Sequence, residues 1–132
     1  MRFIRQVAGS KPNGHYSAGV VAGDMLFISN QLPGLSHRND AVPPYTASLQ
    51  TTSILEKILE ITKAAGGTVG SIVKVTVYVT SLDEWEEVDR AFGEFMGNHK
   101  PARSVVVVPK IKDGWLVSCE AICKLAIEES TQ

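Results

Sequence analysis

The stretch from Ser71 to Thr80 reads SIVKVTVYVT, with a valine at every second position over most of its length. Successive side chains of a strand point to opposite faces of a sheet, so this spacing places four valines on one face. Those valines are Val73, Val75, Val77 and Val79. We predict a half-buried strand whose valine face packs on the core and whose other face carries Thr76 and Tyr78.

Helices are predicted on both sides of this strand. Before it, apolar residues from Ile54 to Ala65 recur at spacings of three and four, which indicates a helix over about Tyr45–Ala65 that ends at Gly66-Gly67. After it, Ser81–Glu84 has the form of a capping box and opens a second helix that ends near Gly97. An apolar stripe on that helix is expected in the core: Trp85, Val88, Phe92, Phe95 and Met96.

The remaining strands complete a sheet. Ser17–Ala22 and Met25–Ser29, separated by Gly23-Asp24, are typical of a hairpin, and Gln31–Pro44 is expected to be a long surface connection. In the last strand Glu120 alternates away from the more apolar side. The predicted class is α+β, with two helices on one face of the sheet. The opposite, mixed face favours association with copies of the same chain.

Composition excludes several classes of partner. The chain has 132 residues, which fits a single domain over 1–132, and its 13 basic and 14 acidic residues give a net charge of −1. We expect no nucleic-acid partner because there is no basic field, and no membrane partner because there is no long apolar run. Without a hydrophobic leader segment, a cytoplasmic location is expected. Cys119 and Cys123 are expected to be core thiols, and the scattered histidines give no metal site.

One cation and one acid stand out near the end of the chain. Arg103 opens an otherwise apolar strand, in which residues 100–108 read KPARSVVVV, and Glu120 lies inside the next strand. Neighbouring strands can bring such a pair into one pocket, which suggests carboxylate recognition combined with proton chemistry. An ordinary alternative for Arg103 is an ion pair with an acid at a subunit interface.

Taken in order, segments spread over nearly the whole chain resemble the RidA/YjgF family of enamine/imine deaminases. They are Gly14–Ser17, Leu26–Pro33, Ala64–Gly67, Val73–Val79, Pro101–Ser104 and Glu120–Ile122. The P-x-R-S element together with the later E-A-I is the most specific part of the resemblance.

The resemblance implies a chorismate-mutase-like fold and a homotrimer whose sheets form a central barrel, with ligand clefts between subunits. It implies that Arg103 binds the carboxylate of a small substrate. Glu120 would handle the water that hydrolyses a 2-imino acid to its 2-keto acid and ammonia, without a cofactor. Substrate-binding positions carried over with these are Tyr16, Ser29, Asn30, Asp89 and Ser104.

Three positions depart from the family pattern. Asn30 replaces the usual glycine, Asp89 replaces an asparagine often found on the second helix, and Val105 follows the R-S pair where cysteine or threonine is common. These changes keep the carboxylate anchor and leave substrate identity open. A pathway-dedicated deaminase of the aminomuconate type and a non-catalytic sensor of small carboxylates are the alternatives. A ribonuclease or translation inhibitor fits the near-zero net charge poorly, and Asp89 could simply be an exposed helix acid.

Overall fold

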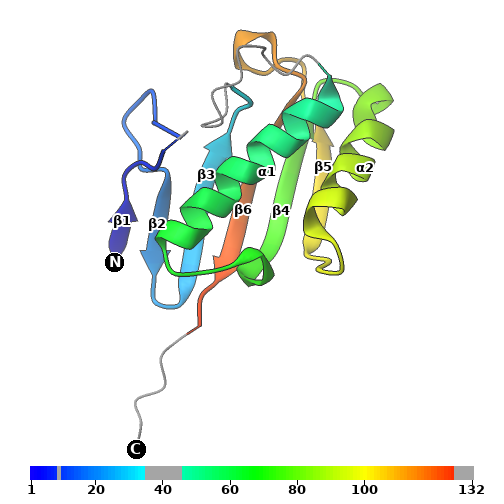
Figure 1. Cartoon of the computed structure of the whole chain (residues 1–132). Helices are drawn as coiled ribbons and strands as arrows, with labels where there is room; N and C mark the ends of the chain where they lie inside the picture. The colour runs from blue at the N-terminus through cyan, green and yellow to red at the C-terminus, as the bar shows by residue number, and fades with distance from the viewer. Residues whose placement is uncertain (9, 35–45, 127–132) are drawn as a thin grey trace, which may run out of the picture.

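A computed structural model describes residues 1–8, 10–34 and 46–126. In them six strands form one sheet in the order β1-β2-β3-β6-β4-β5, covered by two α-helices (Figure 1). The strands are β1 (Arg2–Ile4), β2 (Gly19–Ala22), β3 (Met25–Gln31), β4 (Ile72–Val79), β5 (Ala102–Val107) and β6 (Val117–Lys124). The helices are α1 (Ala47–Ala64) and α2 (Trp85–Met96). The pair β4 and β5 is parallel and the other pairs are antiparallel.

Both helices lie on the same face of the sheet, which confirms the predicted α+β class (Figure 1). Between the layers lies a core of aliphatic side chains, and its centre includes Ile54, Leu55 and Ile58 of α1 and Val75 and Val77 of β4, all with zero exposure. The opposite face of the sheet has no helix over it in the described part of the chain. None of the described helices is long and apolar enough to cross a bilayer.

The alternation in β4 begins two residues later than predicted. Ile72 pairs with Cys123 and Lys74 with Ile122, so Val73 is an extra residue in β4, as in a β-bulge. As a result Val73 is 45% exposed while Ile72 is 1% exposed and takes the core position. The prediction that Val73 belongs to the core face is therefore wrong, whereas Val75, Val77 and Val79 are buried as predicted.

The second helix starts differently from the prediction. Ser81 accepts a hydrogen bond from the Asp83 N–H at 3.1 Å, and a 3₁₀ turn, Leu82–Glu84, precedes α2. Val88, Phe92 and Met96 are buried as expected, but Trp85 is 41% exposed. Trp85 is the first residue of α2, and this helix covers the margin of the sheet, where β5 is the last strand (Figure 1). A side chain at this margin has no further strand to pack against.

The first helix begins close to the predicted position. Thr46 is its N-cap, and the Thr46 hydroxyl accepts from the Leu49 N–H at 3.1 Å. Tyr45 and most of the predicted connection Gln31–Pro44 lie outside the described residues, and Gln31 itself belongs to β3. The short strand β1 was not predicted.

Candidate functional site

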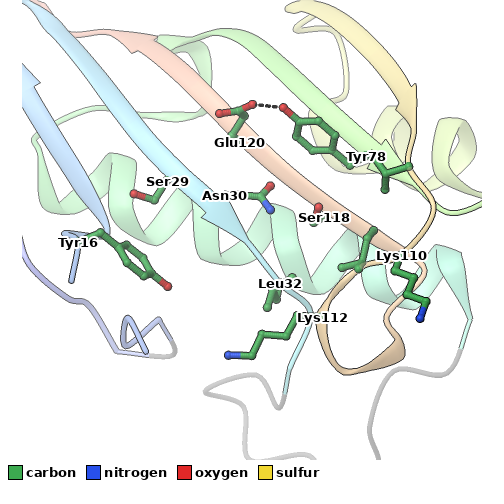
Figure 2. Close-up of a pocket in the computed structure, with 11 residues that line it drawn as sticks. Tyr16, Ser29, Asn30, Leu32, Tyr78, Lys110, Lys112, Ser118 and Glu120 are labelled. Carbon is green, nitrogen blue, oxygen red and sulfur yellow. Dashed lines mark hydrogen bonds between the residues drawn. The ribbon is translucent and has the colours of Figure 1, made fainter. Parts of the chain in front are cut away.

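A concave pocket of about 670 Å³ lies on the helix-free face of the sheet (Figure 2). Because β6 is antiparallel to both β3 and β4, the ends of β3 and β4 meet the start of β6 at this place. The loop after β5 closes one side. The pocket is lined by Tyr16, Ser29, Asn30, Leu32, Tyr78, Val108, Lys110, Ile111, Lys112, Ser118 and Glu120.

Glu120 is held by a tyrosine of the neighbouring strand. The Tyr78 hydroxyl donates a short hydrogen bond to Glu120 Oε1, and Figure 2 shows the second carboxylate oxygen on the side away from Tyr78. This hydrogen bond, with some burial and the negative charge of Glu120, raises the pKa of Tyr78. The phenol therefore stays protonated and fixes one oxygen of the carboxylate, which leaves the other oxygen as the one that a water or a ligand could contact.

Three further predicted site residues line the same pocket as Glu120. Tyr16 lies across it from Tyr78, on the segment before β2, and Asn30 projects from the irregular end of β3 (Figure 2). The Ser29 hydroxyl donates to the Ser17 carbonyl oxygen at 2.7 Å. Because a serine has one O–H proton, Ser29 can only accept a hydrogen bond from a ligand while this bond is made.

Arg103 lies on the other face of the sheet. It pairs in register with Val75, whose side chain is in the core, so Arg103 points to the helix side. There its guanidinium lies 3.0 Å from Asp89 of α2, between Nη1 and Oδ1, and 4.9 Å from the centre of the Phe92 ring. The strand order also puts β4 between β5 and β6. The prediction that neighbouring strands of one chain bring Arg103 and Glu120 together is therefore wrong.

Ser104 lies on the opposite side from Arg103. It pairs with Thr76, which in turn pairs with Glu120, so these three residues form a row across the helix-free face. Ser104 is half-buried and does not line the pocket around Glu120. Asp89 is separated from that pocket by the sheet and belongs with Arg103.

The two cysteines are structural. Both are free and buried, as predicted, on the core side of β6. Burial raises the pKa of the Cys119 thiol to about 12, although the positive charge of Arg103 acts in the opposite direction. A thiol with such a pKa is protonated at neutral pH and is a poor nucleophile.

Sequence reasoning missed four polar residues of the pocket. Tyr78 was predicted on the correct face without a functional role, and no role was predicted for Ser118, Lys110 or Lys112. The pairing of Tyr78 with Ser118 in adjacent strands puts the tyrosine ring next to Glu120. That register depends on the pairing of β4 with β6, which no local sequence signal specifies.

Comparisons with known proteins agree with this architecture. The family model described as Endoribonuclease L-PSP matches residues 8–125. A RutC family protein of Pyrococcus horikoshii is 34% identical over 112 residues, which cover 85% of this chain and 88% of the relative. TdcF of Escherichia coli, which carries the provisional name reactive intermediate deaminase, is 32% identical over 83% of this chain and 85% of its own.

Solved structures share the fold over nearly the full length. The crystal structure of E. coli TdcF with bound serine superposes with a TM-score of 0.86 at 29% identity and covers 96% of this chain and all of its own. RidA from the Antarctic bacterium Psychrobacter superposes with a TM-score of 0.84 at 28% identity, over 94% of this chain and all of its own.

Proposed function

Because the chain belongs to the Endoribonuclease L-PSP family, which is the RidA/YjgF family, we propose that it hydrolyses small 2-imino acids to 2-keto acids and ammonia. The preferred substrates in this proposal are 2-iminobutanoate, 2-iminopropanoate and the enamines with which they interconvert. The structure of TdcF with bound serine supports a small ligand that carries a carboxylate.

One observation carries the proposal: the anchor and the acid are on opposite faces of the sheet. Arg103 faces the helices and Glu120 faces the open side, so a single chain holds two half-sites. We propose that two copies combine the Arg103 half of one with the Glu120 half of the other, within the expected trimer. Asp89 would then accompany Arg103, and Tyr16, Ser29 and Asn30 would accompany Glu120.

The open face of the sheet favours such an association. One register row across five strands carries Phe3, Val20, Phe27, Ile122 and Lys74, and Phe3 and Phe27 are about half exposed. Apolar side chains that follow one another across a sheet form a continuous patch, which is costly to leave in water. Burial of this row against a second copy would remove that cost and bring Ser104, at the edge of the same face, close to the subunit boundary.

The proposed chemistry needs few groups. The guanidinium of Arg103 holds the substrate carboxylate through paired N–H donors, and this fixes the C=N carbon relative to Glu120. Glu120 accepts a proton from water as its oxygen adds to the carbon of the protonated C=N group, which gives a neutral carbinolamine. Glu120 then returns that proton to the nitrogen and takes up the hydroxyl proton as the C–N bond breaks, so ammonia leaves and the carbonyl of the keto acid forms. Tyr78 keeps the carboxylate oriented throughout.

Ammonia release from imines generated in situ by an amino acid oxidase tests the proposal. Arg103→Ala and Glu120→Gln are each expected to lower kcat/KM by about 100-fold or more, while the oligomer persists. Arg90→Ala and Glu94→Gln are matched controls, because both residues are exposed on α2, and they should keep the wild-type rate. Wild-type rates in Arg103→Ala would refute the anchor. Stabilisation by small carboxylates without any turnover would favour the sensor.

A second candidate, a deaminase dedicated to a dicarboxylic imine of the aminomuconate type, is favoured by one feature of the pocket. Lys110 and Lys112 are both exposed on the loop that closes the pocket around Glu120, and they offer two cations to a second carboxylate (Figure 2). In this case the double variant Lys110→Gln, Lys112→Gln would raise KM for a dicarboxylic substrate and leave KM for 2-iminobutanoate unchanged.

A further inference from the structure

We infer that Asp89 makes the Arg103 anchor selective for zwitterionic ligands, so that the protonated imino acid is bound in preference to the keto acid product. The inference rests on the proposed function for the identity of the substrate. It concerns a property that can be measured without turnover, namely the discrimination between an α-nitrogen cation and an α-carbonyl.

The Arg103 guanidinium already has a carboxylate beside it. Asp89 Oδ1 lies 3.0 Å from Arg103 Nη1, and the two side chains are 48% and 20% exposed. The rings of Phe92 and Trp85 lie with their centres 4.9 Å and 6.0 Å from the guanidinium carbon. These rings displace water around the cation, so charges close to it are screened less than on an open surface.

This ion pair leaves room for a ligand. A guanidinium has five N–H donors in a fixed fork, whereas one carboxylate engages at most two of them in a bidentate pair. A substrate carboxylate can therefore bind Arg103 while Asp89 stays in contact with it. The pocket beside the pair is lined by residues at the end of α2 and the start of β5, including Gly93, Met96 and Pro101.

The charges of Arg103 and Asp89 determine which kind of ligand binds more tightly. Arg103 and Asp89 together are neutral, so a plain carboxylate gains the attraction of Arg103 but also meets the repulsion of Asp89. A ligand with a cationic nitrogen next to its carboxylate interacts favourably with both charges. His99 and Lys100 also line this pocket, and both stay unchanged when Asp89 is replaced, so a comparison of Asp89→Asn with the wild type isolates the charge of Asp89.

The reaction removes the cationic nitrogen on which this preference depends. A protonated 2-imino acid carries a positive nitrogen beside its carboxylate, and it is also more electrophilic at the C=N carbon than the neutral imine. The product keto acid has lost the nitrogen as ammonia and is a simple anion. Asp89 therefore favours the reactive form of the substrate and weakens the binding of the product. An asparagine at the same position would retain the hydrogen-bonding shape without this electrostatic preference.

Calorimetric titration with two ligands of one carbon skeleton, L-2-aminobutanoate and 2-oxobutanoate, tests the inference on the intact oligomer at fixed ionic strength. The wild type is expected to bind the amino acid at least about tenfold more tightly than the keto acid. Asp89→Asn should reduce this ratio by about tenfold, mainly through tighter binding of the keto acid. Glu86→Gln, which removes a charge one turn earlier on the exposed surface of α2, should leave the ratio unchanged.

Two results would overturn the inference: an unchanged ratio in Asp89→Asn, including one in which both ligands lose affinity equally, or no Arg103-dependent binding of either ligand to the wild type. Asp89→Ser serves as a second neutral variant if the asparagine variant loses its thermal stability. Ammonia assays separate this outcome from the proposed function. Turnover with an unchanged ratio leaves the deaminase intact and removes the role of Asp89, whereas a changed ratio without turnover keeps the role of Asp89 and removes the deaminase.

Discussion

Arg103 and Glu120 point to opposite faces of one sheet, with β4 between the strands that carry them. Each residue has its own partner on its own side: Asp89 contacts Arg103, and Tyr78 contacts Glu120. A chain built in this way cannot use both groups on one small molecule. For the anchor and the acid to meet, the helix-free face of one copy must lie against the β5 edge of another copy.

Mixed oligomers give a direct check of that geometry. Arg103→Ala and Glu120→Gln subunits, each inactive alone, are expected to regain about one quarter of the wild-type ammonia-release rate when unfolded together in equal amounts and refolded. A site that takes Arg103 from one copy and Glu120 from another is intact only when the first copy carries Arg103 and the second carries Glu120. In an equal mixture each condition is met about half of the time, so about one quarter of the sites are intact. If each site lay within one chain, the mixture would stay as inactive as its components.

Tyr78 offers a test of how Glu120 is held. Tyr78→Phe removes the hydrogen bond to Oε1 with little change in shape, and we expect kcat to fall by about tenfold with KM nearly unchanged. The pKa of Tyr78 is raised, so the phenol is protonated at neutral pH and the bond is lost only as the pH rises through this raised value. The stabilisation that it gives to the fold is fully present below the pKa of an unfolded tyrosine.

Spectrophotometric titration of the tyrosines measures the same contact. The chain has three tyrosines, and one should ionise above the ordinary range in the wild type. In Glu120→Gln that late transition should move back towards about 10, since the partner charge and the strong acceptor are gone. A wild-type curve without a late transition would argue against the contact.

Much of the fold could be read from residue patterns because its elements are locally encoded. The apolar spacing of α1 and the alternation from Val75 to Val79 each reflect one face packed on the core. The exceptions arise where the partner strand decides the outcome. Val73 leaves the core face because β4 has one residue more than β6 at that point, and a regular alternation carries no sign of this bulge.

Stability measurements can confirm which residue the bulge buries. Ile72→Ala is expected to lower the free energy of unfolding by about 2–4 kcal/mol because it opens a cavity in the core. Val73→Ala should change it by less than about 1 kcal/mol, since that side chain is largely in solvent. Urea denaturation at a fixed protomer concentration compares the two, because association contributes to the stability of an oligomer. A larger loss of stability in Val73→Ala than in Ile72→Ala would contradict the bulge and indicate that Val73 occupies the core position.

The candidate site was harder to read than the fold for a related reason. Arg103 and Glu120 could be singled out as charges inside apolar strands, but whether they meet depends on strand order, which places β6 next to β4 and leaves β5 at the margin. Tyr78 was visible only as a residue of the mixed face. Its contact with Glu120 needs the antiparallel register of β4 and β6, a relationship between segments 42 residues apart in the sequence.

The cysteines supply a last prediction, on reactivity. Cys119 and Cys123 are buried, and burial raises the pKa of both thiols, that of Cys119 to about 12. Since the thiolate is the reactive form, neither residue should react with a disulfide reagent at neutral pH in the folded protein. Two thiols should appear when the chain is unfolded in denaturant. Rapid modification of the native protein would contradict this, and Cys119→Ala and Cys123→Ala would then show which thiol is accessible.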